Sequence, residues 1–216
     1  KGIEENRAEY ERLIEVFKAH NIRYFFYNGG GDSADTCQKV SEIGAKMGFP
    51  LQAIHVPKTI DNDLPFTDNC PGFGSVAKYV ALSTQEAALD IASMCATSTK
   101  VFIIEVMGRA SGFLAVEIGI AGGAEAIVIP EYPISTADII QPIINNPRKK
   151  LTSIIVIAEA DKPGHSMEIA NEIKQLCNIE YKTCILGHTQ RGGTPTVKDR
   201  TIASRMGYRA VENIKP

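Results

Sequence analysis

One short loop gathers two carboxylates, an amide and a lysine, since residues 57–63 have the sequence PKTIDND. Carboxylates two residues apart, as in Asp61 and Asp63, can divide the work of removing a proton and holding a hard cation. Asn and Asp are also favoured in solvated turns for backbone reasons, which is the structural alternative. The combination with Lys58 and Thr59 is too particular for a simple turn and favours a functional loop.

Two further segments place an arginine among glycines: residues 107–112 are MGRASG, and residues 187–193 are GHTQRGG. Arginine grips a phosphate through two parallel hydrogen bonds, a geometry that lysine lacks. Arg109 could instead cover the edge of a sheet, and His188 could be a structural histidine. The pairing of His188 with Arg191 in a glycine-rich loop favours an anion site.

The segment 28–33, NGGGDS, is a third kind of candidate. Gly30 and Gly31 would let a backbone approach a phosphate closely, and a helix beginning there would offer free N–H groups. Glycines also serve tight turns for geometry alone. Asp32 and Ser33 can cap the helix, but the Asp32 carboxylate would repel a phosphate unless a cation lies between them.

These loops all follow apolar segments that alternate with helical ones, as in an α/β fold with a parallel sheet covered on both faces. Ligands of such sheets bind at the carboxyl ends of the strands. Glu131, which follows one strand, could accept hydrogen bonds from sugar hydroxyls. The patterns predict strands over 22–27, 51–56, 101–106, 126–129, 153–158 and 183–186. They predict helices, in chain order, over 4–20, about 33–47, 75–97, from 111 onward, over 137–144 and 166–177, and from about 198 onward.

The composition is that of an ordinary globular protein, with 44% hydrophobic and 22% charged residues and a net charge of −2. This balance gives no basic field for nucleic acid or anionic membranes, and the apolar runs are too short to span a bilayer. Five cysteines without a C-x-x-C pair indicate free thiols in a reducing compartment, so we expect a cytoplasmic protein. The sequence opens and closes with helices, so we expect it to be part of a longer protein.

The four motifs, in this order and spacing, resemble the phosphofructokinase family. The match runs from about Tyr24 to Val211, with TIDND and MGR as its most specific parts and GHTQRGGTPTVKDR (187–200) as its sugar-phosphate segment. The resemblance implies transfer of a phosphoryl group to O1 of fructose 6-phosphate, with Mg²⁺. It also implies two Rossmann-like α/β lobes. The donor-phosphate lobe would hold residues 1–72 and 190–216, and the sugar-phosphate lobe 73–189.

The resemblance also implies a role for each motif residue. Asp61 matches the base that takes the proton from the sugar 1-hydroxyl, and Arg109 matches an arginine that stabilises charge on the transferred phosphoryl group. His188 and Arg191 match ligands of the 6-phosphate. The other implied substrate-binding residues are Thr59, Asp63, Met107, Gly108 and Glu131.

Three departures from the family pattern stand out. Lys100 and Lys182 occupy positions where many members have arginines that reach into a neighbouring subunit's site, which implies a homo-oligomer, either a dimer or a tetramer. Gly31 occupies the usual place of a magnesium-binding aspartate, leaving Asp32 one residue later as the candidate metal ligand. The family's first glycine-rich donor loop, expected before residue 1, is absent from the sequence.

Two residues bear on the donor. Members that use ATP resemble one another in having glycine at the positions of Asp32 and Lys58. The Asp32 carboxylate would repel the α-phosphate of ATP, and Lys58 would supply positive charge for a phosphate leaving group. Together with Gly30, Gly31 and Ser33 they form the expected donor side, and we predict diphosphate as donor in a reversible glycolytic step. The alternatives are an ATP-dependent 6-phosphofructokinase and a non-catalytic sugar-phosphate-binding fragment.

Overall fold

The computed structural model describes residues 4–94, 100–145, 152–160 and 163–214. The chain divides into two compact units, the first made of Lys1–Thr59, Leu64–Pro71 and Val197–Pro216, the second of Ile60–Asp63 and Gly72–Thr196. The lobes expected from the sequence differ from these units chiefly at residues 60–63 and 190–196. Their assignment to the donor and the sugar phosphate stays a prediction.

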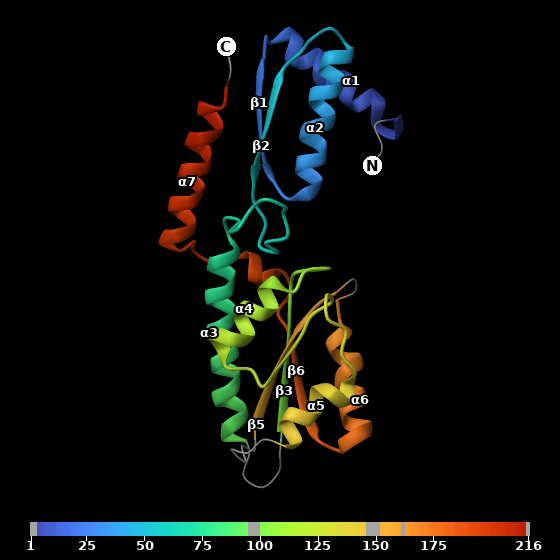
Figure 1. The fold of residues 1–216 in the computed structure, drawn as a ribbon, viewed down its shortest axis with the longest axis vertical. Helices are drawn as coiled ribbons and strands as arrows, with labels where there is room; N and C mark the ends of the chain where they lie inside the picture. Colours follow the sequence, from blue (N-terminus) through green and yellow to red (C-terminus); the bar gives the residue numbers. More distant parts are fainter. Residues whose placement is uncertain (1–3, 95–99, 146–151, 161–162, 215–216) are drawn as a thin grey trace. The chain divides into compact units, whose positions relative to one another are not determined.

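The first unit is built on two parallel strands, β1 (Tyr24–Gly29) and β2 (Gln52–Pro57), paired in register from Tyr24↔Gln52 to Gly29↔Pro57. A short 3₁₀ turn, η1 (Glu4–Asn6), precedes helix α1 (Arg7–Ala19), and helix α2 (Gly31–Lys46) connects the strands (Figure 1). Helix α7 (Val197–Glu212) contacts β2. The core of this unit lies between the strands and α1 and α2, and consists of Ile14, Phe17, Val40, Ile43, Phe49 and Leu51.

Two local predictions for this unit were wrong. The first strand begins at Tyr24 rather than Ile22, because Asn21 is in the left-handed region (φ 51°) and the Ile22 N–H donates to the Phe17 carbonyl at 2.8 Å. Neither Asp32 nor Ser33 caps α2. The helix begins at Gly31 with Gly30 as its N-cap, and Ser33 lies inside the first turn with its N–H donating to the Gly30 carbonyl at 3.1 Å.

The second unit is a four-stranded parallel sheet in the order β4-β5-β3-β6. The strands are β3 (Lys100–Val106), β4 (Ala126–Val128), β5 (Thr152–Ala158) and β6 (Glu180–Ile185). The helices are α3 (Phe73–Ser93), α4 (Phe113–Gly122), α5 (Thr136–Ile144) and α6 (His165–Cys177), with the 3₁₀ helix η2 (Gly187–Arg191) after β6 (Figure 1).

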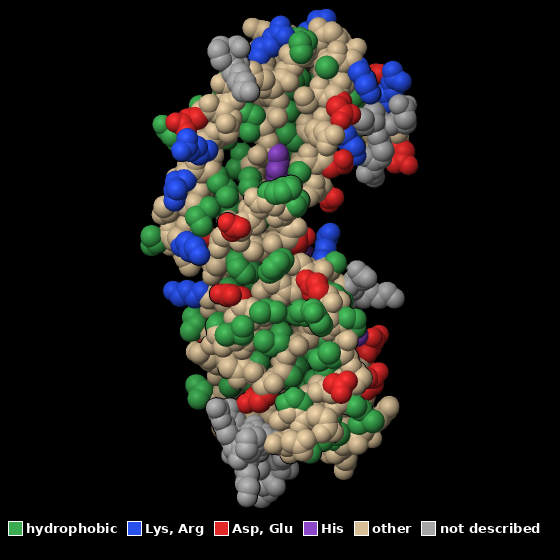
Figure 2. All heavy atoms as spheres, viewed as in Figure 1, with side chains coloured by type: hydrophobic (Ala, Val, Ile, Leu, Met, Phe, Trp, Pro, Cys, Tyr) green, Lys and Arg blue, Asp and Glu red, His purple; other side chains and the backbone are tan. Residues whose placement is uncertain are grey.

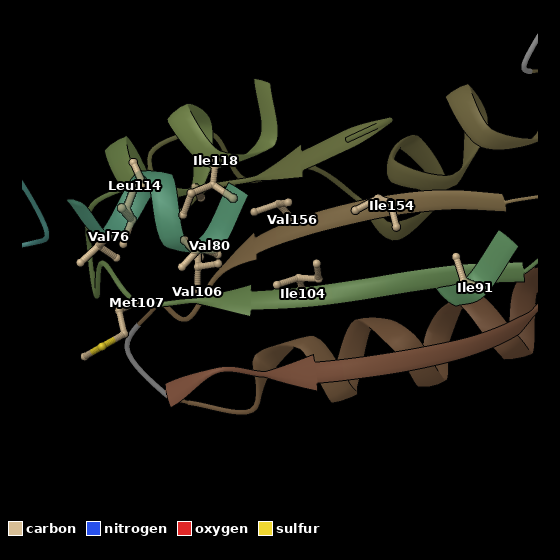
Figure 3. Packing of buried hydrophobic residues seen from close by; sticks show 13 residues of the cluster. Val76, Val80, Ile91, Ile104, Val106, Met107, Leu114, Ile118, Ile154 and Val156 are labelled. Carbon is tan, nitrogen blue, oxygen red and sulfur yellow. The ribbon is translucent and has the colours of Figure 1, made fainter. Parts of the chain in front are cut away.

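Alternate residues of the central strands point to opposite faces, so each face has its own hydrophobic core. Ile104 and Val106 of β3 pack with α3 and α4, as Figure 3 shows, through Val76, Val80, Ile91, Leu114 and Ile118. Val101 and Ile103 pack instead with α5 and α6. Because both faces are covered, β3 and β5 are apolar along nearly their whole length, which confirms the predicted α/β class.

The element limits in this unit differ from expectation by a few residues. Helix α4 begins at Phe113 rather than Ser111, because a turn closed by the Ser111 N–H on the Gly108 carbonyl occupies the preceding residues. Strand β6 begins at Glu180, earlier than predicted, because it pairs with β3 from Lys100 onward despite its polar residues.

None of the helices in the described part of the chain is long and apolar enough to cross a membrane. On the face seen in Figure 2, the described Lys and Arg side chains stand singly or in small groups among acidic ones.

Candidate active site

The loop after β3 is an unusual turn at the carboxyl edge of the second unit's sheet. Gly108 has φ 139°, and a Cβ there would lie 2.4 Å from the Ser111 carbonyl oxygen, so no larger residue fits without a shift. Arg109 follows with φ 49°, a conformation that L-residues seldom adopt. The Arg109 side chain is exposed, whereas Met107, two residues earlier, is buried. The turn thus presents a positive charge at the strand end, and the predicted phosphate contact of Arg109 stays a prediction.

The loop with paired carboxylates lies against this turn. The Ser111 hydroxyl donates to the backbone carbonyl of Asp61 at 3.2 Å. Asn62 is buried, with φ 54°, and this places Asp61 and Asp63 on either side of a tight bend. The Oδ1 atom of Asp61 is buried, whereas the Asp63 side chain is exposed. The structure therefore brings together two motifs that are about 50 residues apart in the sequence.

A buried glutamine ties a third motif to the same strand end. The side-chain oxygen of Gln190 accepts the Met107 backbone N–H at 3.1 Å, and its side-chain nitrogen donates to the Gly187 carbonyl at 3.0 Å. Gln190 is 1% exposed, whereas His188 and Arg191 of the same 3₁₀ helix are exposed. Gln190 thus anchors the short helix that carries the two predicted 6-phosphate ligands.

Glu131, the predicted partner of sugar hydroxyls, lies beside the same turn. Its Oε1 accepts the Gly112 backbone N–H at 2.7 Å, just before α4 begins. A Cβ on Gly112 would lie 2.7 Å from Oε2 of this carboxylate and 2.5 Å from the Ile129 Cβ. The hydrogen bond from the Gly112 N–H fixes one oxygen of the Glu131 carboxylate. The residue is nevertheless exposed, so solvent still reaches the side chain.

Two further acidic residues at this edge were missed by the sequence analysis. Glu105, only 1% exposed, accepts the Gly164 N–H at 2.7 Å, and its other oxygen accepts the Ser166 N–H at 3.0 Å and the Ser166 hydroxyl at 2.6 Å. It caps the start of α6. A glutamate inside the otherwise apolar run VFIIEV was the available signal, because a buried carboxylate needs partners.

Glu159, directly after β5, is the second. Its N–H donates to the Val106 carbonyl at 2.8 Å. Burial raises the pKa of Glu159 above its usual value, the nearby Asp61 and Glu105 charges add to this rise, and the polar and charged groups of Arg109 oppose it. Glu159 therefore shares one charged environment with the predicted base and the predicted arginine.

The predicted donor residues meet at the carboxyl edge of the first unit's sheet. Gly30 is the N-cap of α2 and has no side chain with which to cap it. A Cβ on Gly30 would lie 3.8 Å from the Lys58 carbonyl oxygen and from the Thr59 Cβ, so the two loops are neighbours. Lys58 and Asp32 are both exposed. A helix N-terminus beside a lysine suits a phosphate, and the donor role of these residues stays a prediction.

Asp32, the predicted magnesium ligand, does not belong to a cluster of metal-binding side chains among the described residues. Asp32 is in the first turn of α2, and the described residues contain no group of three or more His, Cys, Asp or Glu side chains able to hold a metal. This arrangement still fits Mg²⁺, which is usually held by one or two carboxylates together with substrate phosphates and water.

Lys100 and Lys182 do not join the loops at the carboxyl edge. Lys100 is the first residue of β3, and its Nζ lies 2.9 Å from Oε2 of Glu180, the first residue of β6. Lys182 is exposed near the same end. The seven-residue strand β3 separates Lys100 from Arg109 by roughly 20 Å. Their predicted role in a neighbouring subunit's site stays a prediction.

The cysteines have no part in either group of loops. Cys37 and Cys70 are buried, Cys177 and Cys184 are half-buried, and all four are free thiols. Burial raises the pKa of the Cys37 thiol, which makes it less reactive. Cys95 lies outside the described residues.

Comparisons with known proteins agree on one family. A family model described as phosphofructokinase matches residues 1–214. The pyrophosphate–fructose 6-phosphate 1-phosphotransferase of Halomonas elongata is 50% identical over 214 residues, which are 97% of this chain and 49% of that relative. The ATP-dependent 6-phosphofructokinase of Coxiella burnetii is 45% identical over 210 residues, 97% of this chain and 61% of that relative.

Among solved structures, the pyrophosphate-dependent phosphofructokinase from Nitrosospira multiformis superposes with a TM-score of 0.86 at 48% identity. The match covers 96% of this chain and 56% of that one. The chain spans 49% of the length of the Halomonas relative.

Proposed function

Because the chain belongs to the phosphofructokinase family, we propose that the protein transfers a phosphoryl group from diphosphate to O1 of fructose 6-phosphate. One observation carries the proposal: three loops distant in sequence meet at one sheet edge. The Ser111 hydroxyl joins the turn after β3 to the Asp61 loop, and Gln190 joins it to the helix of His188 and Arg191. Phosphoryl transfer needs this kind of positioning and charge stabilisation.

In this proposal Asp61 takes the proton from the sugar 1-hydroxyl, so that the oxygen can attack phosphorus. Arg109 stabilises the negative charge on the transferred group. His188 and Arg191 hold the 6-phosphate at a distance from the reacting hydroxyl.

The remaining predicted residues would position the sugar. Met107 and Gly108 would line its binding place, and Glu131 would accept hydrogen bonds from its hydroxyls. Thr59 and Asp63 would contact the sugar or the transferred phosphate from the loop that carries the base.

The first unit would hold the donor. The free N–H groups at the start of α2, beside Gly30 and Gly31, suit a phosphate anion. Lys58 would stabilise the departing phosphate as the bond to it breaks. A Mg²⁺ ion, held by the donor's phosphates and by Asp32, would neutralise part of their charge.

Diphosphate rather than ATP is favoured by Asp32 and Lys58. The Asp32 carboxylate would repel the α-phosphate of ATP. Diphosphate has only the transferred phosphoryl group and the departing phosphate, so it has no group at that position. The relatives from Halomonas elongata and Nitrosospira multiformis, whose names specify pyrophosphate, support this choice. The Coxiella relative, named as ATP-dependent, makes the donor the point to test.

The test compares forward turnover of the full-length protein with magnesium diphosphate and with magnesium ATP. We expect diphosphate to be preferred, and the double variant Asp32→Gly, Lys58→Gly to lose most diphosphate activity. Lys46→Ala, which removes a lysine from the opposite end of α2, is the control and should leave activity unchanged. A wild-type preference for ATP would refute the donor assignment. Unchanged diphosphate activity in the double variant would show that neither residue selects the donor.

Calorimetry with fructose 6-phosphate separates catalysis from simple binding. Binding without turnover by either donor would favour the non-catalytic alternative. We also propose that the protein is a cytoplasmic homo-oligomer, either a dimer or a tetramer, in which Lys100 and Lys182 reach a neighbouring subunit. Analytical ultracentrifugation of the full-length protein tests this, because a monomer at assay concentration would rule out shared sites.

A further inference from the structure

The carbonyl of Gly29, the last residue of β1, receives two hydrogen bonds. The Lys58 backbone N–H donates to it at 2.9 Å, which continues the ladder between β1 and β2 beyond the Gly29↔Pro57 pair. The His55 side chain supplies the second donor, with its Nε2 atom 2.9 Å from the same oxygen. A carbonyl oxygen only accepts hydrogen bonds, so Nε2 must carry a hydrogen. His55 and Lys58 thus use both lone pairs of this carbonyl.

These hydrogen bonds fix a peptide group that lies among glycines. The peptide joins Gly29 to Gly30, and glycine restricts the backbone less than any other residue. Gly30 is the N-cap of α2, and Gly31 is the first residue of that helix. Because the peptide is trans and planar, its C=O and N–H groups point in opposite directions. Holding the Gly29 carbonyl therefore also fixes the direction of the Gly30 N–H.

The histidine reaches this peptide from a well-supported position. His55 is half-buried in β2, where it pairs with Tyr27 of β1, two residues before each strand ends. Gly29 is buried, and a Cβ there would lie 2.0 Å from the Ser33 Oγ, so the first turn of α2 packs directly against it. The hydrogen bond therefore joins a regular strand to the start of α2.

We propose that His55 is a positioning residue of the donor site. Its Nε2–H holds the Gly29 carbonyl and so orients the peptide from which the N–H groups at the start of α2 are presented to diphosphate. The first N–H groups of a helix have no partner within it, so their alignment decides how well they bind an anion. The inference rests on the proposed function for the identity of the donor. His55 does not touch the donor in this account and acts only through the Gly29–Gly30 peptide.

Steady-state kinetics of the full-length protein test this role. His55→Leu keeps the apolar bulk but removes the hydrogen-bond donor. It should raise the KM for diphosphate by about tenfold or more, the factor expected when an N–H loses its alignment with a charged group. His55→Gln offers an amide N–H at a reach similar to that of Nε2, and should keep this KM within about threefold. His20→Leu, which removes an exposed histidine at the end of α1, is the matched control and should leave the KM unchanged.

The KM for fructose 6-phosphate separates positioning of the donor from a general structural role. It should change by less than about threefold in each of these variants. Equal increases in the two KM values of His55→Leu would overturn the proposal, as would a His55→Gln variant as impaired as His55→Leu.

A double-mutant cycle excludes action through the Lys58 side chain, which is the nearest alternative route. Lys58→Ala removes that side chain and keeps the backbone N–H that bonds the Gly29 carbonyl. If His55 acts through the peptide, His55→Leu should raise the KM for diphosphate by the same factor in the Lys58→Ala background as in the wild type. Loss of the effect in that background would overturn the proposal.

Two readouts do not depend on turnover. Long-range proton–nitrogen correlation NMR of the wild type should show the His55 hydrogen on Nε2, and a ring protonated on Nδ1 alone would overturn the proposal. Calorimetry should show diphosphate binding about tenfold weaker in His55→Leu than in the wild type, and equal affinities would overturn it. Binding of diphosphate without phosphoryl transfer by the wild type would refute the proposed function, while the calorimetric comparison would still decide the role of His55.

Discussion

Truncation of Gln190 should destabilise the candidate site and weaken its binding of substrate. Its side chain joins the end of β3 to η2 through hydrogen bonds of 3.1 Å to the Met107 N–H and 3.0 Å to the Gly187 carbonyl. Gln190→Ala removes both at a position that is 1% exposed. Water reaches the half-buried Gly187 more easily than the buried Met107, so the Met107 N–H is the group left without compensation.

The expected magnitude follows from these contacts. An ordinary buried hydrogen bond contributes about 1 kcal/mol, and a buried donor left without a partner costs about 1–3 kcal/mol. The free energy of unfolding should therefore fall by about 2–4 kcal/mol. Because η2 also carries His188 and Arg191, the same change should raise the KM for fructose 6-phosphate by roughly tenfold or more.

Chemical denaturation and steady-state kinetics of the full-length protein measure the two effects. Gln141→Ala is the matched control, since Gln141 is exposed on α5 and its side-chain oxygen accepts a hydrogen bond from the neighbouring Asn145 side chain. This variant should change neither quantity appreciably. A loss below about 0.5 kcal/mol in Gln190→Ala, with an unchanged KM, would refute the view that this glutamine anchors η2.

Three further predictions concern charged groups. Asp61→Asn should lower kcat by about 10² or more with a modest change in KM, as expected for loss of a general base, and near-normal turnover would remove Asp61 from that role. Arg191→Ala should raise the KM for fructose 6-phosphate at least about tenfold while the KM for the donor stays within a few-fold; the reverse pattern would mean that the two sites have been exchanged. Lys100 lowers the pKa of Glu180 through a hydrogen bond and its positive charge. The pair therefore stabilises the fold at pH values above the ordinary Glu pKa, and this contribution is lost as the pH falls through the lowered pKa of Glu180. In Lys100→Met the Glu180 pKa should return toward its usual range, measured by NMR titration, and an unchanged pKa would show that the pair does not form in solution.

Much of the fold of the second unit could be predicted because its central strands, β3 and β5, are buried on both faces. A nearly continuous apolar run such as residues 101–106 has few alternatives to a central parallel strand, and its pairing with β5 and β6 confirms the interpretation. Strand β6 was predicted too short, because an edge strand with Lys182 exposed does not show a continuous apolar pattern. The start of α2 was misplaced for a different reason, since Gly30 caps the helix with its backbone and leaves no side-chain signal.

The motif residues of the candidate site could be proposed from the sequence, whereas the residues that hold them in place could not. Asp61 and Arg109 belong to short, distinctive segments. Gln190 acts across 83 residues of sequence, and nothing in its local surroundings indicates a distant backbone partner. Glu105 alone carried a local signal, as a charge in an apolar run, but its partners at the start of α6 required the structure.

The strand order of the second unit has a consequence for synthesis on the ribosome. Both neighbours of β3 in the sheet, β5 and β6, come later in the chain, and β5 ends about 50 residues after β3. At about 5–20 residues per second, the apolar segment VFIIEV therefore stays without a strand partner for about 3–10 s after it is made. Both of its edges are open to intermolecular pairing during that interval. Aggregation of the nascent chain should thus depend on translation speed between residues 107 and 158, and slowing synthesis there should increase the demand for chaperones.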